Sequence, residues 1–197
     1  MPLRYAAEPA NGTNLVRAGL NRLSTRPNRL SEAGADPNAL QVTQPHAVYD
    51  LRADAVANGG GLESAVFSGF RYLVGDGDTS LAAAEVQADT AGNATLLANL
   101  NYGPFVAATA QALPRVAALA PVNAGSYEVR ALRFAAIGLM ALWLKPEAGR
   151  ADIIYPLAPA PPGLRADQPY SADDFLRAVR PLAAQRRSAE SGRTMVP

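Results

Sequence analysis

The stretch YEVRALRFAAIGLMALWLKPEAGRADIIYPLAP, residues 127–159, holds the longest apolar run of the chain and its only tryptophan, Trp143. From Phe134 to Leu144 there are eleven consecutive apolar or glycine residues. A membrane-spanning helix needs about 20 such residues. We therefore interpret this run, which is bounded by charges and proline, as the buried centre of a globular fold.

Alternation along this stretch predicts three consecutive strands, at 127–134, 137–144 and 153–157. Both alternating faces of the middle strand are apolar, whereas a strand at the surface of a sheet shows one polar face to water. The middle strand is therefore predicted to be central and covered on both sides. That cover must come from helices, from the N-terminal residues or from another subunit. Two predicted helices are few for both faces, which favours a partner.

The rest of the chain adds local signals of both secondary-structure types. Runs at 66–74 and 81–88 flank the turn sequence GDGDTS and predict a hairpin, and shorter strands are predicted at 47–51 and 95–100. Helices are predicted at 104–119, after Gly103-Pro104, and at 171–183, where Ser171 is the capping residue. The sequence thus predicts one α+β domain with a mainly antiparallel sheet of about five to seven strands, covered by two or three helices.

Composition divides the chain into three parts. Residues 1–45 are rich in proline, asparagine and arginine and show no sustained period, which predicts an extended N-terminal arm. Residues 46–183 form the predicted globular domain. Residues 184–197 are polar and are predicted to be a flexible C-terminal tail.

The overall composition excludes several kinds of chemistry. The 197 residues contain no cysteine, so disulfides, zinc–thiolate centres, iron–sulfur clusters and thiol nucleophiles are excluded. The N-terminus lacks the apolar segment of a secretory signal, and no run is long enough to span a membrane, so a cytoplasmic location is expected.

Charge is distributed unevenly along a chain whose net charge is +1. Residues 46–176 carry 13 acidic and 8 basic side chains, whereas residues 177–197 carry 5 basic and 1 acidic. An acidic body makes nucleic-acid binding an unlikely function. Basic ends on an acidic body indicate self-association or a protein partner, although solvated termini would show the same pattern.

The turn GDGDTS at 75–80 follows an apolar strand, and the spacing of Asp76 and Asp78 resembles the aspartyl nucleophile loop of haloacid-dehalogenase-type phosphatases. The resemblance implies a nucleophilic carboxylate, a second carboxylate for proton transfer and bound magnesium. It covers only six residues. That family also needs a later lysine and an acidic pair, and the single lysine here, Lys145, has no such pair nearby. We interpret the sequence as a polar hairpin turn.

Other candidate groups are isolated in the sequence. The sole histidine, His46, follows Pro45 at the edge of the predicted arm, a poor position for a catalytic base. Four carboxylates could meet if the strands bring them together: Glu85, Asp89, Glu128 and Asp152. The glycines at 59–61 are better explained as a helix stop than as an anion cradle, and Gly103-Pro104 offers at most a weak anion site.

Two arginines of the predicted strand at 127–134 must have different partners. Arg130 and Arg133 lie on opposite faces of that strand, so one of them is expected to pair with Glu85 or Glu128.

Taken together, the sequence predicts no catalytic residue, no cofactor and no metal site. The first hypothesis is a non-enzymatic structural or interaction subunit of a larger assembly, with the arm at 1–45 docking on a neighbouring chain. The alternative is a small-ligand-binding or hydrolytic domain that uses carboxylates near the 75–89 hairpin. A pocket with convergent polar groups would favour the alternative.

Overall fold

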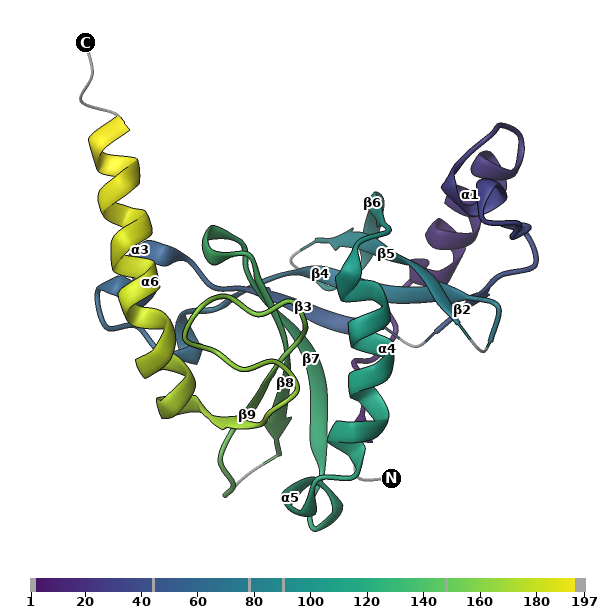
Figure 1. Ribbon diagram of the computed structural model, residues 1–197. Coiled ribbons are helices and arrows are strands. Elements are labelled where there is room, and N and C mark those ends of the chain that lie inside the picture. The colour runs from purple at the N-terminus through teal and green to yellow at the C-terminus, as the bar shows by residue number, and fades with distance from the viewer. Residues whose placement is uncertain (1–2, 44, 78, 90, 148, 194–197) are drawn as a thin grey trace.

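A single mixed sheet organises the chain (Figure 1). The computed structural model describes residues 3–43, 45–77, 79–89, 91–147 and 149–193. In these ranges ten strands form one sheet in the order β10-β9-β8-β7-β3-β4-β5-β6, with β1 added to β7 and β2 added to β4. The strands are β1 (Leu3–Arg4), β2 (Gln41–Val42), β3 (His46–Asp50), β4 (Val66–Gly75), β5 (Ser80–Ala88), β6 (Ala94–Asn101), β7 (Tyr127–Phe134), β8 (Leu139–Pro146), β9 (Ile153–Pro156) and β10 (Tyr170–Ser171).

The prediction of one α+β domain with a mainly antiparallel sheet is confirmed. Among the described strands only two pairs are parallel, β3 with β7 and β1 with β7. The sheet has ten strands rather than the five to seven predicted. The three additional strands, β1, β2 and β10, contain two residues each, which is too short to produce a periodic signal in the sequence.

Three main helices cover the sheet, together with shorter turns. None of the helices in the described ranges is long and apolar enough to cross a bilayer. The main helices are α1 (Gly12–Ser24), α4 (Pro104–Ala117) and α6 (Ala172–Arg193). The shorter elements are α2 (Arg29–Glu32), α3 (Ala53–Ala57), α5 (Ala120–Asn123) and the 3₁₀ turns η1 (Leu62–Ser64) and η2 (Ala135–Ile137).

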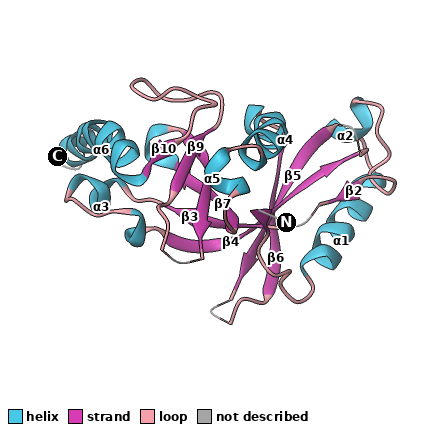
Figure 2. Ribbon diagram, turned by 90° about the horizontal axis from the view of Figure 1, so that it is seen from below, coloured by secondary structure: helices cyan, strands magenta, loops and turns pink. Residues whose placement is uncertain are grey.

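The helices lie on opposite faces of the sheet. Helices α6 and α1 lie at its two ends, with α4 between them (Figures 1 and 2). The buried cluster under α4 contains Val129 and Leu144, and we call this side the α4 face. The other side, here called the α1/α6 face, carries Leu132 under α6 and Tyr72 under α1.

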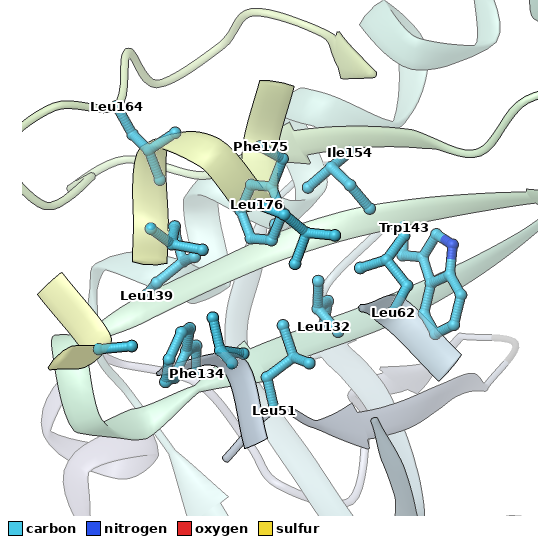
Figure 3. Close-up of a cluster of buried hydrophobic side chains, with 14 residues drawn as sticks. Leu51, Leu62, Leu132, Phe134, Leu139, Trp143, Ile154, Leu164, Phe175 and Leu176 are labelled. Carbon is cyan, nitrogen blue, oxygen red and sulfur yellow. The ribbon is translucent and has the colours of Figure 1, made fainter. Parts of the chain in front are cut away.

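The prediction of a central apolar strand within residues 127–159 is confirmed, because β8 lies between β7 and β9 and is buried on both faces. On the α1/α6 face, Trp143 and Leu139 pack with Phe175 of α6 (Figure 3). Each large apolar side chain buried in this way contributes roughly 1.5–3 kcal/mol. Residues of this chain cover both faces of β8, so the argument that another subunit is needed to cover it no longer holds.

The strand β8 begins at Leu139, two residues later than predicted. The preceding residues form the turn η2, and Gly138 follows with φ +67°. That left-handed conformation is accessible to glycine at little cost and interrupts an extended run. The apolar pattern alone contains no sign of this interruption.

No clear N-terminal arm is present. The first 45 residues contribute α1, α2 and two strands that pair with the sheet, and Val16, Leu20 and Leu30 are almost fully buried. Val16 and Leu20 lie four residues apart, so they share one face of α1 and dock together on the sheet. An added Cβ at Gly19 would lie 2.1 Å from Leu97, so glycine permits the close approach of α1 to β6.

The C-terminal helix is longer than the sequence predicts. Ser171 caps it as expected, accepting a hydrogen bond from the backbone N–H of Asp174 at 3.1 Å. The helix then continues through Pro181 to Arg193, beyond the expected end at residue 183. Much of the predicted flexible tail is therefore helical, and its last residues, 194–197, lie outside the described ranges. Pro114 likewise lies inside α4, which continues to Ala117.

Candidate functional site

Four charged side chains from four strands form a continuous ionic chain on the α4 face. Nη1 of Arg71 donates to Oε1 of Glu85 at 2.8 Å, and Nη1 of Arg133 donates to Oε2 of the same carboxylate at 2.9 Å. Arg133 also binds Asp50 in a bidentate manner, with distances of 2.6 Å and 3.0 Å. The sheet register creates this arrangement, because Arg71 lies opposite Glu85 and Asp50 lies beside Arg133.

The side chains of this ionic chain become more buried toward Arg71. The side chain of Arg71 is 2% exposed, that of Glu85 is 17% exposed, and Arg133 is about one-third exposed. Desolvation lowers the pKa of Arg71, and the nearby Glu85 carboxylate opposes that shift. The hydrogen bond to Asp50 raises the pKa of Arg133. Arginine is not deprotonated in proteins, so both guanidinium groups stay charged.

The residues around Arg71 do not provide a hydrogen-bond acceptor for every N–H of its guanidinium group. In the described part of the protein, its Nε–H is buried and has no hydrogen-bond partner. A buried donor without a partner costs about 1–3 kcal/mol, more for a charged group. Arg71 is therefore a buried cation with unused hydrogen-bonding capacity.

Arg71, Glu85 and Arg133 are the charged side chains of a pocket of about 290 Å³, here called the α4-face pocket. Its wall is completed by β6, by the start of α4 and by the η2–β8 turn. Most of this surface is apolar, as in typical small-molecule sites. The other lining residues are Asn99, Asn101, Gly103, Phe105, Ala135, Gly138, Leu139 and Met140.

The N-terminus of α4 opens into this pocket. Gly103 is the capping residue, Pro104 is the first helical residue, and no described side chain caps the helix. The first turn of a helix carries a partial positive charge, and in α4 the N–H of Phe105 is what remains to bind an anion, because Pro104 has no N–H and the N–H of Val106 donates to the Gly103 carbonyl. Two arginines and a helix N-terminus thus meet around one hollow, and the carboxylates of Glu85 and Asp50 balance the charge of the two arginines.

This arrangement suits the binding of an anionic group attached to an apolar body. An anion would meet the two guanidinium groups, while Phe105, Leu139 and Met140 offer an apolar surface to the rest of the molecule. No cluster of three or more potential metal-ligating side chains is found in the residues that the structure describes.

His46 lies in a different environment from the one predicted. It is buried within β3 rather than at the edge of an arm, and its ring contacts Tyr5 at a centroid distance of 5.2 Å. Desolvation lowers the pKa of His46 to about 4. The ring is neutral at pH 7, and neither ring nitrogen has a hydrogen-bond partner in the described structure. The error follows from treating residues 1–45 as unpacked.

The described residues of GDGDTS, 75–77 and 79–80, span the end of β4 and the start of β5, in line with the interpretation as a hairpin turn. Oδ1 of Asp76 accepts a hydrogen bond from the backbone N–H of Thr79 at 2.8 Å, a contact typical of turns. Asp78, the second carboxylate of the phosphatase-like spacing, lies outside the described residues.

The four candidate carboxylates pair with separate partners. Glu85 belongs to the ionic chain, and Asp89 accepts backbone hydrogen bonds in the turn before β6. On the α1/α6 face, Glu128 accepts a hydrogen bond from Arg130 at 2.6 Å. Asp152 accepts one from the indole N–H of Trp143 at 3.0 Å. The structure therefore makes no acid–base pair of these groups.

The two arginines of β7 have the separate partners that strand alternation requires. Arg133 pairs with Glu85 on the α4 face, and Arg130 pairs with Glu128 on the other face. Arg130 also lies over the rings of Tyr49 and Trp143, at 4.7 Å and 5.1 Å from their centroids. The prediction that one of them meets Glu85 or Glu128 is confirmed for both.

The two glycine sites considered have different surroundings. The backbone N–H of Gly61 donates to Oε1 of Glu63 at 2.8 Å, so a carboxylate of the chain already occupies that position. Gly103 instead borders the α4-face pocket. Sequence analysis missed Arg71, whose signal was a single charge within the apolar strand FSGFRYLVG.

Comparison of this chain with known protein families, with curated proteins and with solved structures finds no match.

Proposed function

We propose that this protein is a binding domain for a small molecule that carries an anionic group on an apolar body. The observation that supports the proposal best is the unsaturated, buried guanidinium group of Arg71 at a mostly apolar pocket. The pocket includes Glu85 of the 75–89 hairpin, and it thus favours the second of the two functions expected from the sequence.

The proposed roles follow from position and charge. Arg71 and the first turn of α4 bind the anionic group, and Arg133 offsets part of the charge of the neighbouring Glu85 through their 2.9 Å hydrogen bond. Phe105 and Met140 contact the apolar body. A volume of about 290 Å³ limits the ligand to a small molecule.

The assembly function expected from the sequence remains a proposal, but it needs a different contact. The N-terminal segment packs on its own sheet, so it is not free to dock on a neighbour. Light scattering on the full chain tests self-association directly. A strictly monomeric chain over a wide concentration range would remove self-association through any surface.

Ligand binding is tested by titrating the protein with benzoate, hexanoate and 3-phenylpropionate, each compared with the neutral alcohol of the same carbon skeleton. We expect the carboxylates to shift the side-chain Nε–H resonances of Arg71 and Arg133 in ¹H–¹⁵N spectra, and to leave that of Arg130 unchanged. If no carboxylate of this panel shifts Arg71 or Arg133, or if the alcohols bind equally well, the proposal is wrong.

A charge-matched pair of variants tests whether the carboxylate binds in the α4-face pocket. Asn101→Asp adds a negative charge to the pocket wall, whereas Asn21→Asp adds the same charge to the exposed surface of α1. A negative charge about 6 Å from the bound carboxylate, in a medium of effective dielectric constant 20, costs between 2 and 3 kcal/mol of binding free energy before screening. We therefore expect benzoate to bind at least about tenfold more weakly to the Asn101→Asp variant. The Asn21→Asp variant should bind benzoate as the parent protein does.

A further inference from the structure

The strand β6 forms one edge of the sheet. It pairs with β5, and no other described strand lies on its outer side. Its sequence, ATLLANLN, contains no charged residue and no proline, and Leu96 is 54% exposed. Natural sheets usually protect such an edge with charges, proline or a covering segment, because its free N–H and C=O groups can pair with another strand.

A groove runs along this edge between β6 and α1. It encloses about 410 Å³ and is mostly apolar. Leu23 of α1 forms one wall, while Leu97 and Leu100 of β6 form the other. The groove lies on the α1/α6 face, and of its lining residues it shares Asn99 with the α4-face pocket.

Two arginines border the groove from the α1 side. Arg22 lies in the last turn of α1, and Arg26 lies just beyond the end of the helix; both line the groove. Neither guanidinium group has an ion pair or hydrogen bond within the described part of the chain, and β6 supplies no carboxylate. The groove therefore combines an apolar floor with two unpaired positive charges beside a partly occupied strand edge, where the N–H of Ala94 donates to the Ala10 carbonyl and that of Leu100 to Oδ1 of Asn99.

From these features we infer that β6 is a docking site for an extended peptide segment of a partner protein, which adds to the sheet as a further strand. Main-chain hydrogen bonds to β6 hold the segment, and its side chains on the α1 side enter the groove. Those side chains alternate between apolar residues, which contact Leu23 and Leu97, and carboxylates, which pair with Arg22 and Arg26.

A second copy of this chain fits the edge less well. Two copies joined edge to edge through β6 in an antiparallel manner would place both α1 helices on the same side of the joined sheet. Arg22 and Arg26 of each copy would then meet like charges, with no acidic residue in β6 to balance them. The partner is therefore an acidic segment of another protein.

Fluorescence anisotropy with the labelled peptide TLTETLTE tests this inference. In a strand, the leucines and glutamates of this peptide share one face, whereas the threonines lie on the other. The matched peptide TLTKTLTK replaces both glutamates with lysine. Each exposed ion pair changes affinity by no more than about fivefold. We therefore expect TLTETLTE to bind between fivefold and twentyfold more tightly than TLTKTLTK.

Reversing the charge of one groove residue provides a second test. Arg22→Glu should weaken TLTETLTE binding and strengthen TLTKTLTK binding, while Arg165→Glu, an exposed loop position far along the chain, should change neither. Unchanged thermal unfolding, followed by Trp143 fluorescence, will show that both variants fold.

Hydrogen exchange in the presence of TLTETLTE locates the contact. The inference requires slower exchange of backbone N–H groups in residues 94–101. Absence of binding, equal binding of the two peptides, or binding without protection of β6 would each overturn it. None of these results bears on carboxylate binding at Arg71, so the two proposals fail separately.

Discussion

Replacing Leu20 with alanine tests whether the N-terminal segment is part of the folded domain. The Leu20 side chain is 1% exposed and packs in the cluster that also contains Val16, Tyr72 and Val74. Its truncation removes buried apolar contacts and leaves a cavity between α1 and the sheet. An arm that docks on a neighbouring chain would instead leave the stability of an isolated chain unchanged.

The size of the effect follows from this burial. Truncating a fully buried leucine to alanine typically costs 2–5 kcal/mol. We take about 3 kcal/mol for Leu20, because the site lies under one helix that can relax toward the sheet. In a chain of this length each kcal/mol lowers Tm by roughly 2–4 °C, so a decrease of about 6–12 °C is expected.

The assay is thermal unfolding followed by the fluorescence of Trp143, which lies in the α6 cluster and not in the cluster of Leu20. A single transition at lower temperature would show that α1 stabilises the whole sheet. Leu96→Ala is the matched control, since the same truncation at a 54% exposed position should cost less than about 0.5 kcal/mol. An unchanged Tm for Leu20→Ala would refute the integral role of α1.

Three further predictions concern ionisable and capping groups. The pKa of His46 is near 4 in the folded protein, against 6.5 when unfolded, so the unfolded chain alone binds a proton between those values. The free energy of unfolding should therefore fall by about 3 kcal/mol as the pH drops from 6.5 to 4. In urea titrations at both pH values, the His46→Gln variant should lack this pH-dependent loss. Glu85→Gln leaves two arginines without their shared carboxylate and should cost about 2 kcal/mol, measured as Tm; Glu147→Gln, in an exposed pair, should cost less than about 0.5 kcal/mol. Ser171→Ala removes the cap of α6 and should cost about 1 kcal/mol in the same assay; no change would mean that the cap does not stabilise α6.

The elements with local signals could be predicted from the sequence. The strand at 127–134 matches β7, and the hairpin around residues 75–80 matches β4 and β5. The cap at Ser171 was recognised because capping depends on residues only three positions apart. In each case the determining interactions lie within one strand, one turn or one helical turn.

The N-terminal segment could not be predicted in the same way. Its helix α1 has only Val16 and Leu20 as almost fully buried apolar side chains, and its first strand pairs with residues more than 120 positions away. A weak local pattern was therefore read as an arm. The buried state of His46 was missed for the same reason, because it depends on what covers β3.

The candidate site was predictable only in part. The hairpin fixes Arg71 opposite Glu85, and strand alternation correctly separated the partners of Arg130 and Arg133. The position of Asp50 beside Arg133 depends on the parallel pairing of β3 with β7, for which the sequence carries no local signal. The pocket also could not be predicted from the sequence, because one of its walls is the start of α4, which meets the strands only in the folded protein.

The parallel pairing of β3 with β7 has a consequence for the order of folding. Strands β4, β5 and β6 are connected by short turns, as are β7, β8 and β9, so each group can form from neighbouring residues. The contact between the two groups joins residues such as Asp50 and Arg133, 83 positions apart, and closing so long a loop is slow. During synthesis, β3 has no β7 to pair with until residue 134 has been made. We therefore expect two local sheets to form early and to join late along β3 and β7, where the ionic chain then closes across the junction.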